Sequence, residues 1–394
     1  MFEPEFIGLY FTNGVIDQQV FSIVFGVYFL VSFLTCLFLY LFSKIRFLFS
    51  RVSLLYFNCL ATADIYRNFK LSLFFYLASV FSLLLYVGYV GGYTYLWQNI
   101  GARQDIFAGS GFFLRLVVLS LQFFGVSIFL NLITRSRILA IFFVLLTSGF
   151  LFSLGGRLSV FEFLFCIFFA YIFFVGIARI RLSYIFILVM LVVFSVFVGE
   201  LRKPTTLEAM RESPVAYIEK FSGGFLKAVM PYTIPVQRDV VIVEYFSSRD
   251  FWYGASYSSV LYGFFPSALI PDKPPVDTGR YIVALANGFE ITPPVPVGKL
   301  PNYGWPESFM AGYVNFGIVG VIGIVFLSCL VVVYFYKALL FRPSVVLVMI
   351  YSSLMVRGVK YLDPLNIISL TIFIIVLTIL AVITSFFLRV RVYV

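Results

Sequence analysis

The sequence predicts an all-α polytopic membrane protein, with about nine or more transmembrane helices and one large external loop. The chain has 394 residues, of which 62% are hydrophobic and only 12% are charged, whereas a soluble domain carries roughly 25% charged residues. Its mean hydropathy is +1.03, and the apolar residues come in runs close to the ~20 residues that cross a bilayer. So few charged side chains cannot cover a globule of this size in water.

The apolar runs define the predicted spans, which cover residues 19–43, 71–91, 110–133, 138–156, 158–178, 183–199, 311–335, 343–356 and 364–388. The run 343–356 is short, which predicts a tilted or broken helix. Residues 47–63 are also apolar but include Arg51. Counting them as a span would place Lys44 and Arg46 outside, so we expect an interfacial helix at the cytoplasmic surface.

Basic residues in the short loops fix the predicted orientation. The loops on one side of the membrane hold many basic residues and a single acid, Asp64. The positive-inside rule assigns that side to the cytoplasm. The N-terminus is then outside and the C-terminus inside. The basic residues of this side are Lys44, Arg46, Arg51, Arg67, Lys70, Arg135, Arg137, Arg179, Arg181, Lys337, Arg342, Arg389 and Arg391.

The spans divide the chain into an N-terminal bundle of about six spans (residues 1–199), a large external loop (200–310) and about three C-terminal spans (311–394). The loop holds more than half of the 18 acids and most of the 16 prolines. Its richness in aromatic residues argues against disorder. Within it, the stretch Ser256–Ile270 is apolar but too short to cross a bilayer, so we expect an interfacial or re-entrant element there.

Composition also excludes several classes of function. The net charge is +10, but no continuous basic face emerges, so we expect no nucleic-acid partner. The chain has no histidine, which removes histidine general bases and imidazole metal ligands. The 4 cysteines form no CxxC pair and are predicted to be buried thiols. Since no carboxylates have metal-binding spacing either, we expect neither metal nor cofactor.

Arg157 is the first candidate site residue. It follows Gly155 and Gly156 in a tight external turn, where the glycines permit close backbone approach and the start of a helix favours anions. The alternative is that Arg157 only anchors a span end at the interface. Glu162 lies inside the next apolar run, and such a carboxylate needs a partner, either Arg157 or an arginine of another helix.

Further candidates lie elsewhere on the predicted outer side. Arg103 follows an aromatic cluster that forms either an interfacial belt or a platform for sugar stacking, and Arg115 is another cation near the outer face. In the large loop, Glu307 stands where a span begins, as either a helix cap or a site carboxylate. The remaining candidates of this loop are Lys273, Asp277, Arg280, Tyr281, Tyr303 and Trp305.

Arginine recognises phosphate through planar, bidentate hydrogen bonds. Several outward-facing arginines near a bilayer therefore suit a lipid-linked phosphate or diphosphate whose tail stays in the membrane. We expect the charge on a leaving diphosphate to be stabilised by guanidinium groups.

In this order, the motifs resemble those of the bacterial O-antigen or capsule repeat-unit polymerases, the Wzy-type enzymes within the O-antigen ligase-like glycosyltransferases. The shared features are a G-[GST]-R turn between central spans, a P-x-K-P…GR pattern in a large outer loop, and a closing E-x-(4–5)-Y-x-N-x-G-x-x-G sequence. They correspond here to Gly155–Arg157, to Pro271–Pro274 with Gly279 and Arg280, and to Glu307, Tyr313, Asn315, Phe316, Gly317 and Gly320.

The resemblance implies a GT-C-like, metal-independent glycosyltransferase in the bacterial cytoplasmic (inner) membrane. It would join undecaprenyl-diphosphate-linked oligosaccharides, as donor and acceptor, on the periplasmic face. Arg157 and Arg280 would hold the donor diphosphate, Arg103 would add a contact, and Glu307 would orient or deprotonate the acceptor hydroxyl. A chain-length regulator is a candidate partner besides membrane lipid.

Three other readings remain open. An O-antigen ligase resembles the same pattern but uses an outer-loop histidine, which this chain lacks. A flippase or transporter of lipid-linked oligosaccharide should carry charges through the middle of several spans and show two related halves. A structural subunit of an envelope complex would not need the arginines.

Overall fold

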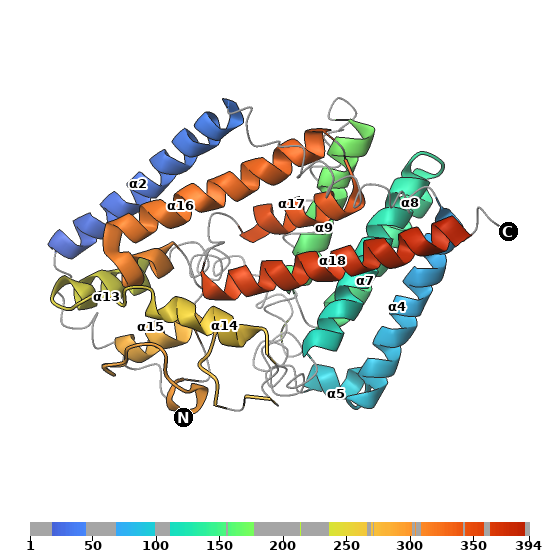
Figure 1. The fold of residues 1–394 in the computed structure, drawn as a ribbon. Coiled ribbons are helices and arrows are strands. Elements are labelled where there is room, and N and C mark those ends of the chain that lie inside the picture. Colours follow the sequence, from blue (N-terminus) through green and yellow to red (C-terminus); the bar gives the residue numbers. More distant parts are fainter. Residues whose placement is uncertain are drawn as a thin grey trace. The chain divides into compact units, whose positions relative to one another are not determined.

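The computed structural model describes residues 18–44, 68–98, 111–154, 157–176, 213, 236–265, 269–270, 272–301, 304, 309–341, 343–357 and 363–390. These residues contain helices and connecting turns but no strand, and Figure 1 shows the helices. Each predicted span within the described residues falls on a helix. The predicted span 183–199 and the interfacial helix 47–63 lie outside the described residues.

Five helices in the described part of the chain are long and apolar enough to cross a membrane. They are α2 (Gln18–Lys44), α4 (Phe69–Tyr89), α7 (Gly111–Ile133), α16 (Met310–Phe341) and α18 (Pro364–Val390). Shorter apolar helices are α8 (Arg137–Ser153), α9 (Arg157–Val175) and α17 (Val345–Arg357). These helices make the chain a membrane protein, while nine or more crossings and the orientation of the termini stay predictions.

Short polar side chains begin several of these helices by accepting hydrogen bonds from the first backbone N–H groups, which have no partner inside the helix. Asn68 Oδ1 accepts from Leu71 N at 3.2 Å to begin α4. Ser344 Oγ accepts from Leu347 N at 3.2 Å to begin α17. Asp363 Oδ1 accepts from Asn366 N at 2.7 Å to begin α18.

The chain forms two compact units. The first contains residues 1–45, 221–333 and 357–371, and the second contains residues 46–220, 334–356 and 372–394. The first unit therefore joins α2 and the large loop to the first parts of α16 and α18. The predicted division at residues 199 and 310 stays a prediction.

In the second unit, α7 is the central helix and packs against α4, α8 and α9. Phe124 of α7 stacks on Phe75 of α4, with ring centroids 5.1 Å apart. At Gly125 the neighbouring helices come so close that an added Cβ would lie 3.1 Å from Phe163 and 3.2 Å from Thr147. The short helix α5 (Gly92–Gln98) belongs to the outer loop that the sequence predicts after α4.

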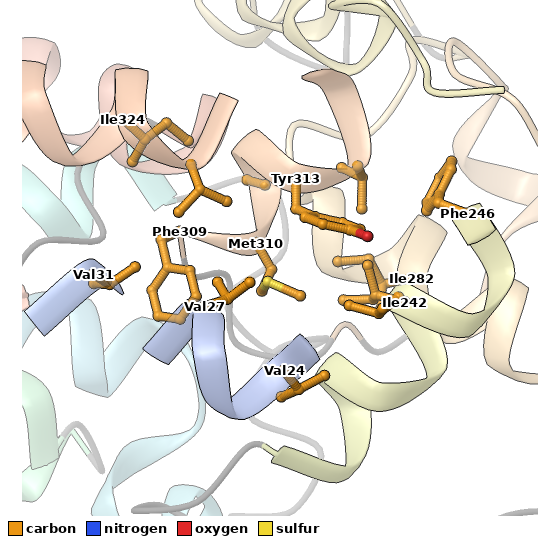
Figure 2. Close-up of a cluster of buried hydrophobic side chains, with 14 of the residues drawn as sticks. Val24, Val27, Val31, Ile242, Phe246, Ile282, Phe309, Met310, Tyr313 and Ile324 are labelled. Carbon is orange, nitrogen blue, oxygen red and sulfur yellow. The ribbon is translucent and has the colours of Figure 1, made fainter. Parts of the chain in front are cut away.

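The first unit folds the large loop into short helices: α13 (Val236–Ser247), η5 (Ala255–Ser258), α14 (Ser259–Gly263), α15 (Thr278–Ala286) and η6 (Val297–Lys299). The apolar side chains of α13 and α15 share one core with α2 and α16. Figure 2 shows Val24 and Val27 of α2 beside Ile242 of α13, Ile282 of α15 and Met310 of α16. The described part of the loop is therefore a layer packed on helices that are apolar enough to span a membrane.

A buried carboxylate joins α13 to α2 in this unit. Asp239 is completely buried, and the Tyr28 hydroxyl donates to its Oδ2 at 2.6 Å. The Tyr28 ring in turn packs edge-on against Phe309, with centroids 5.1 Å apart. A hydrogen bond to a charged group contributes about 1.5–3 kcal/mol, so this pair fastens α13 to α2.

Candidate functional site

The second half of the large loop is organised by α15 and its N-terminal cap. Asp277 Oδ1 accepts a hydrogen bond from Gly279 N at 2.9 Å, and Pro274 and Pro275 precede it. A Cβ added to Gly304 would overlap the Asp277 carboxylate. The structure therefore brings together two predicted segments, the one around Asp277 and Arg280 and the one that contains Gly304.

Arg280 lies in the first turn of α15 and is half-buried. No hydrogen bond or ion pair of its guanidinium to another side chain is seen in the described part of the chain, while its backbone N–H bonds the Asp277 carbonyl at 3.2 Å. Arg249, another arginine of the loop, behaves differently because it pairs with Glu290 and lies over the Tyr245 ring. Arg280 is thus a half-buried cation without a carboxylate partner among the described residues.

Tyr281 takes a structural position. Its side chain is 1% exposed, its ring packs against Trp252, and its hydroxyl donates to the Val295 carbonyl at 3.3 Å and accepts from Val295 N at 3.2 Å. Burial raises the pKa of Tyr281, against the opposing effect of the hydrogen bond to Val295, so the phenol stays protonated at neutral pH. Its predicted contact with substrate stays a prediction.

Replacing Tyr281 with phenylalanine is expected to destabilise the protein. The variant leaves the Val295 N–H without its acceptor, and an unsatisfied buried group costs about 1–3 kcal/mol. The loss of stability is measured by heating the protein in detergent and determining the fraction that remains monodisperse by size-exclusion chromatography. Tyr262→Phe is the matched control, since Tyr262 is 40% exposed, and equal stability of both variants would contradict the structural role of the Tyr281 hydroxyl.

Lys273 closes the turn between α14 and α15. Its Nζ donates to the Phe265 carbonyl at 2.5 Å, and its backbone N–H bonds the Ile270 carbonyl at 3.4 Å. The side chain is partly exposed. Lys273 therefore holds the end of the α14 segment against the proline turn that leads to α15, and its predicted role in substrate binding stays a prediction.

The segment Tyr313–Gly320 forms a break in α16. Phe316 and Gly317 have non-helical backbone angles, with Gly317 at φ +60° and ψ −146°, a region open essentially to glycine alone. After the break the helix passes so close to its own first turns that a Cβ on either Gly312 or Gly320 would overlap the backbone of the other. The glycines of the predicted motif therefore allow two helical pieces to cross in contact.

Asn315 fixes the large loop to this break. It is completely buried, its Nδ2 donates to Ser256 Oγ at 2.8 Å and to the Ala311 carbonyl at 2.7 Å, and its Oδ1 accepts from Gly254 N at 3.1 Å. The backbone N–H of Tyr253 also bonds the Asn315 carbonyl at 2.9 Å. Sequence reasoning did not include Asn315 among the site residues, although an asparagine inside an apolar run is a signal for such a role.

In the second unit, α9 begins at Arg157 as predicted, while its two preceding glycines lie outside the described residues. Ser353 of α17 donates a long hydrogen bond of 3.4 Å to Glu162 of α9. A hydroxyl group on another helix is thus one partner of this buried carboxylate. Whether an arginine is another partner, as the sequence predicts, stays a prediction.

The other predicted site residues are distributed as follows. Arg115 lies in the first turns of α7 and is partly exposed. Arg103, Tyr303, Trp305 and Glu307 lie outside the described residues. Arg157 and Arg115 belong to the second unit and Lys273, Asp277, Arg280 and Tyr281 to the first, so the convergence of Arg157 and Arg280 on one substrate stays a prediction.

Comparison with protein-family models, with curated proteins and with solved structures gave no match.

Proposed function

We propose that the chain is a polymerase that joins lipid-diphosphate-linked oligosaccharide units into a surface polysaccharide on the outer face of the bacterial cytoplasmic membrane. The observation that carries the proposal is the half-buried Arg280, which has no carboxylate partner among the described residues and lies in the helical turn that the Asp277 cap begins. The order of the sequence motifs supports the same assignment, as does the membrane character of the helices.

In this reaction the acceptor sugar hydroxyl attacks the anomeric carbon of the donor, and the bond from that carbon to the diphosphate oxygen breaks. Arg280 and Arg157 bind the departing diphosphate, whose negative charge grows in the transition state. Charge-assisted hydrogen bonds from guanidinium groups strengthen as this charge develops. Glu307 receives or orients the proton of the attacking hydroxyl.

The Asn315 anchor serves this function by holding Trp252–Ser256 of the loop against α16. Since the Trp252 ring packs against Tyr281, the neighbour of Arg280, the anchor and the arginine belong to one packed layer. Pre-organisation of this kind lowers the cost of ordering a loop when substrate binds. The loop can therefore hold its arginine in place before a lipid-linked substrate arrives.

Surface glycan from a strain that lacks the chain tests the proposal. A polymerase defect leaves one repeat unit attached to its carrier or core, because units still reach the outer face but are not joined. Gel electrophoresis separates this single band from the long ladder of the parent strain. Absence of any repeat unit on the outer side would instead indicate a flippase, and an unchanged ladder would exclude both functions.

The proposed reaction uses guanidinium groups and needs no metal, so activity is expected to persist in a chelator. The measurement is polymer formation by the purified protein from lipid-linked repeat units, with and without EDTA. A control glycosyltransferase that depends on a divalent ion establishes that the chelator works. Loss of activity in EDTA that is restored by a divalent ion would contradict the metal-independent mechanism.

A further inference from the structure

The segment around α14 has an unusual distribution of side chains. Large apolar residues point outward: Leu261 is 72% exposed and Leu269 is 70% exposed, and Tyr262, Phe264 and Phe265 are also exposed. We call Leu261, Tyr262, Phe264, Phe265 and Leu269 the apolar wedge. An exposed apolar cluster of this kind marks a surface that meets another apolar phase.

The opposite side of the same segment is made of small residues that face the protein. Ser256 and Ser259 are buried, and the Ser259 hydroxyl is satisfied by the Ser256 carbonyl at 2.6 Å. Gly263 packs so tightly that an added Cβ would overlap Ile368 and would lie 2.9 Å from Val276. The small residues are thus inside and the large apolar residues outside, the reverse of a helix that packs in water.

The contact between Gly263 and Ile368 gives the level of the wedge relative to the membrane. Ile368 lies in the second turn of α18, whose membrane-spanning stretch begins at Pro364, and a helix rises 1.5 Å per residue, or about 6 Å from Pro364 to Ile368. The wedge therefore lies beside the end of a candidate span, where an interface of the bilayer is expected. Leu365, in the first turn of α18, is exposed as well.

Lys273 completes the pattern expected of an interfacial element. Its ammonium group binds the Phe265 carbonyl at the end of the wedge, and Asp272 beside it is exposed. Lysine at such a position lays its apolar stem along the hydrophobic surface and keeps its charge at the level of the headgroups. Asp272 and Lys273 thus lie at the polar end of this segment and the apolar wedge at its apolar end, as expected of an element at a membrane interface.

We infer that the apolar wedge is inserted into the outer leaflet of the phospholipid bilayer. Through the contact of Gly263 with Val276, which directly precedes the Asp277 cap, insertion holds the start of α15 beside the bilayer surface. Arg280 then lies at the height at which the diphosphate of a lipid-linked substrate emerges. This second step rests on the proposed function, whereas the insertion itself does not.

Depth-dependent fluorescence quenching tests the insertion. The background for this experiment is the full-length chain in which Cys36 and Cys59 are replaced by alanine, while the buried Cys166 and Cys329 are retained. Leu261→Cys and Leu269→Cys are introduced into it one at a time. Each variant is labelled with a small fluorophore and studied in nanodiscs. Lipids that carry a nitroxide near the headgroup are expected to remove most of the fluorescence at both positions. Ser248→Cys, next to Arg249, and Thr292→Cys, two residues after Glu290, are matched controls at exposed positions of the same unit. Both are expected to keep their fluorescence.

A second measurement uses the unaltered chain and so does not depend on the folding of a variant. Photoreactive phospholipid is cross-linked in nanodiscs, and the labelled peptides are identified by mass spectrometry. Labelling of residues 261–269 without labelling of residues 247–250 supports insertion. Quenching equal to that of the controls, or lipid labelling of residues 247–250 with none of residues 261–269, would overturn it. Neither readout requires polymerase activity. If the proposed function were wrong and the insertion right, both readouts would still show the wedge in the lipid.

Discussion

Replacement of Arg280 with alanine is expected to abolish polymer formation while the protein still reaches the membrane. The variant removes the half-buried guanidinium of α15 that we assign to the donor diphosphate. Loss of one group that stabilises developing negative charge lowers a rate by about 10²–10³-fold, which leaves only single repeat units on a gel. Arg280→Lys keeps the charge but not the bidentate geometry, so we expect shortened chains in reduced amount.

The matched control is Arg249→Ala in the same loop. Arg249 pairs with Glu290 at the surface, and such exposed ion pairs contribute roughly 0–1 kcal/mol. This variant should give a normal ladder at a normal protein level. Arg157→Ala is expected to behave like Arg280→Ala. A normal ladder from both the Arg157 and the Arg280 variant would contradict diphosphate binding by these residues.

Replacement of Gly320 with alanine is expected to cause the largest loss of stability among single methyl additions in α16. The new Cβ would overlap the Gly312 carbonyl, and a backbone atom cannot move aside as the end of a side chain can. Overpacking of this kind costs about 1–3 kcal/mol. We expect a lower unfolding temperature in detergent and a smaller fraction of monodisperse protein.

The same helix provides a control for the Gly320 substitution. Gly323 lies one turn further along α16 and has no neighbouring atom within 4 Å of an added Cβ. Alanine there introduces no overlap, and it improves helix propensity by about 0.5–1 kcal/mol. Gly323→Ala should therefore match or exceed the parent in stability. If both variants lost stability equally, the close crossing at Gly312 and Gly320 would be wrong.

The helices were predictable because hydrophobic run length is the dominant signal in such a sequence. The runs that became α2, α4, α7 and α18 differ from the observed helices by only a few residues at most ends. The break in α16 was not predicted, because hydropathy is continuous through Phe316 and Gly317. The break depends on the backbone of Gly317, whose φ is positive, and on a contact between Gly312 and Gly320 that no local property encodes.

Individual site residues were predictable to a smaller extent. The exposed wedge agrees with the apolar stretch Ser256–Ile270, which is too short to span a bilayer. A tyrosine in an outer loop is typical of a substrate contact, but Tyr281 is buried by Trp252 and by the chain around Val295. Only the tertiary fold supplies these partners. Tyr28 and Asp239 meet across 211 positions of sequence, and nothing in the neighbourhood of either residue indicates that pair.

The most direct test of the central claim is binding of a polyprenyl diphosphate to the purified protein. The parent chain is expected to bind it more tightly than the corresponding monophosphate, because two guanidinium groups then contact two phosphates. Arg157→Ala and Arg280→Ala should each lose this preference, and Arg249→Ala should retain it. Undiminished preference for diphosphate in both the Arg157 and the Arg280 variant would contradict the account.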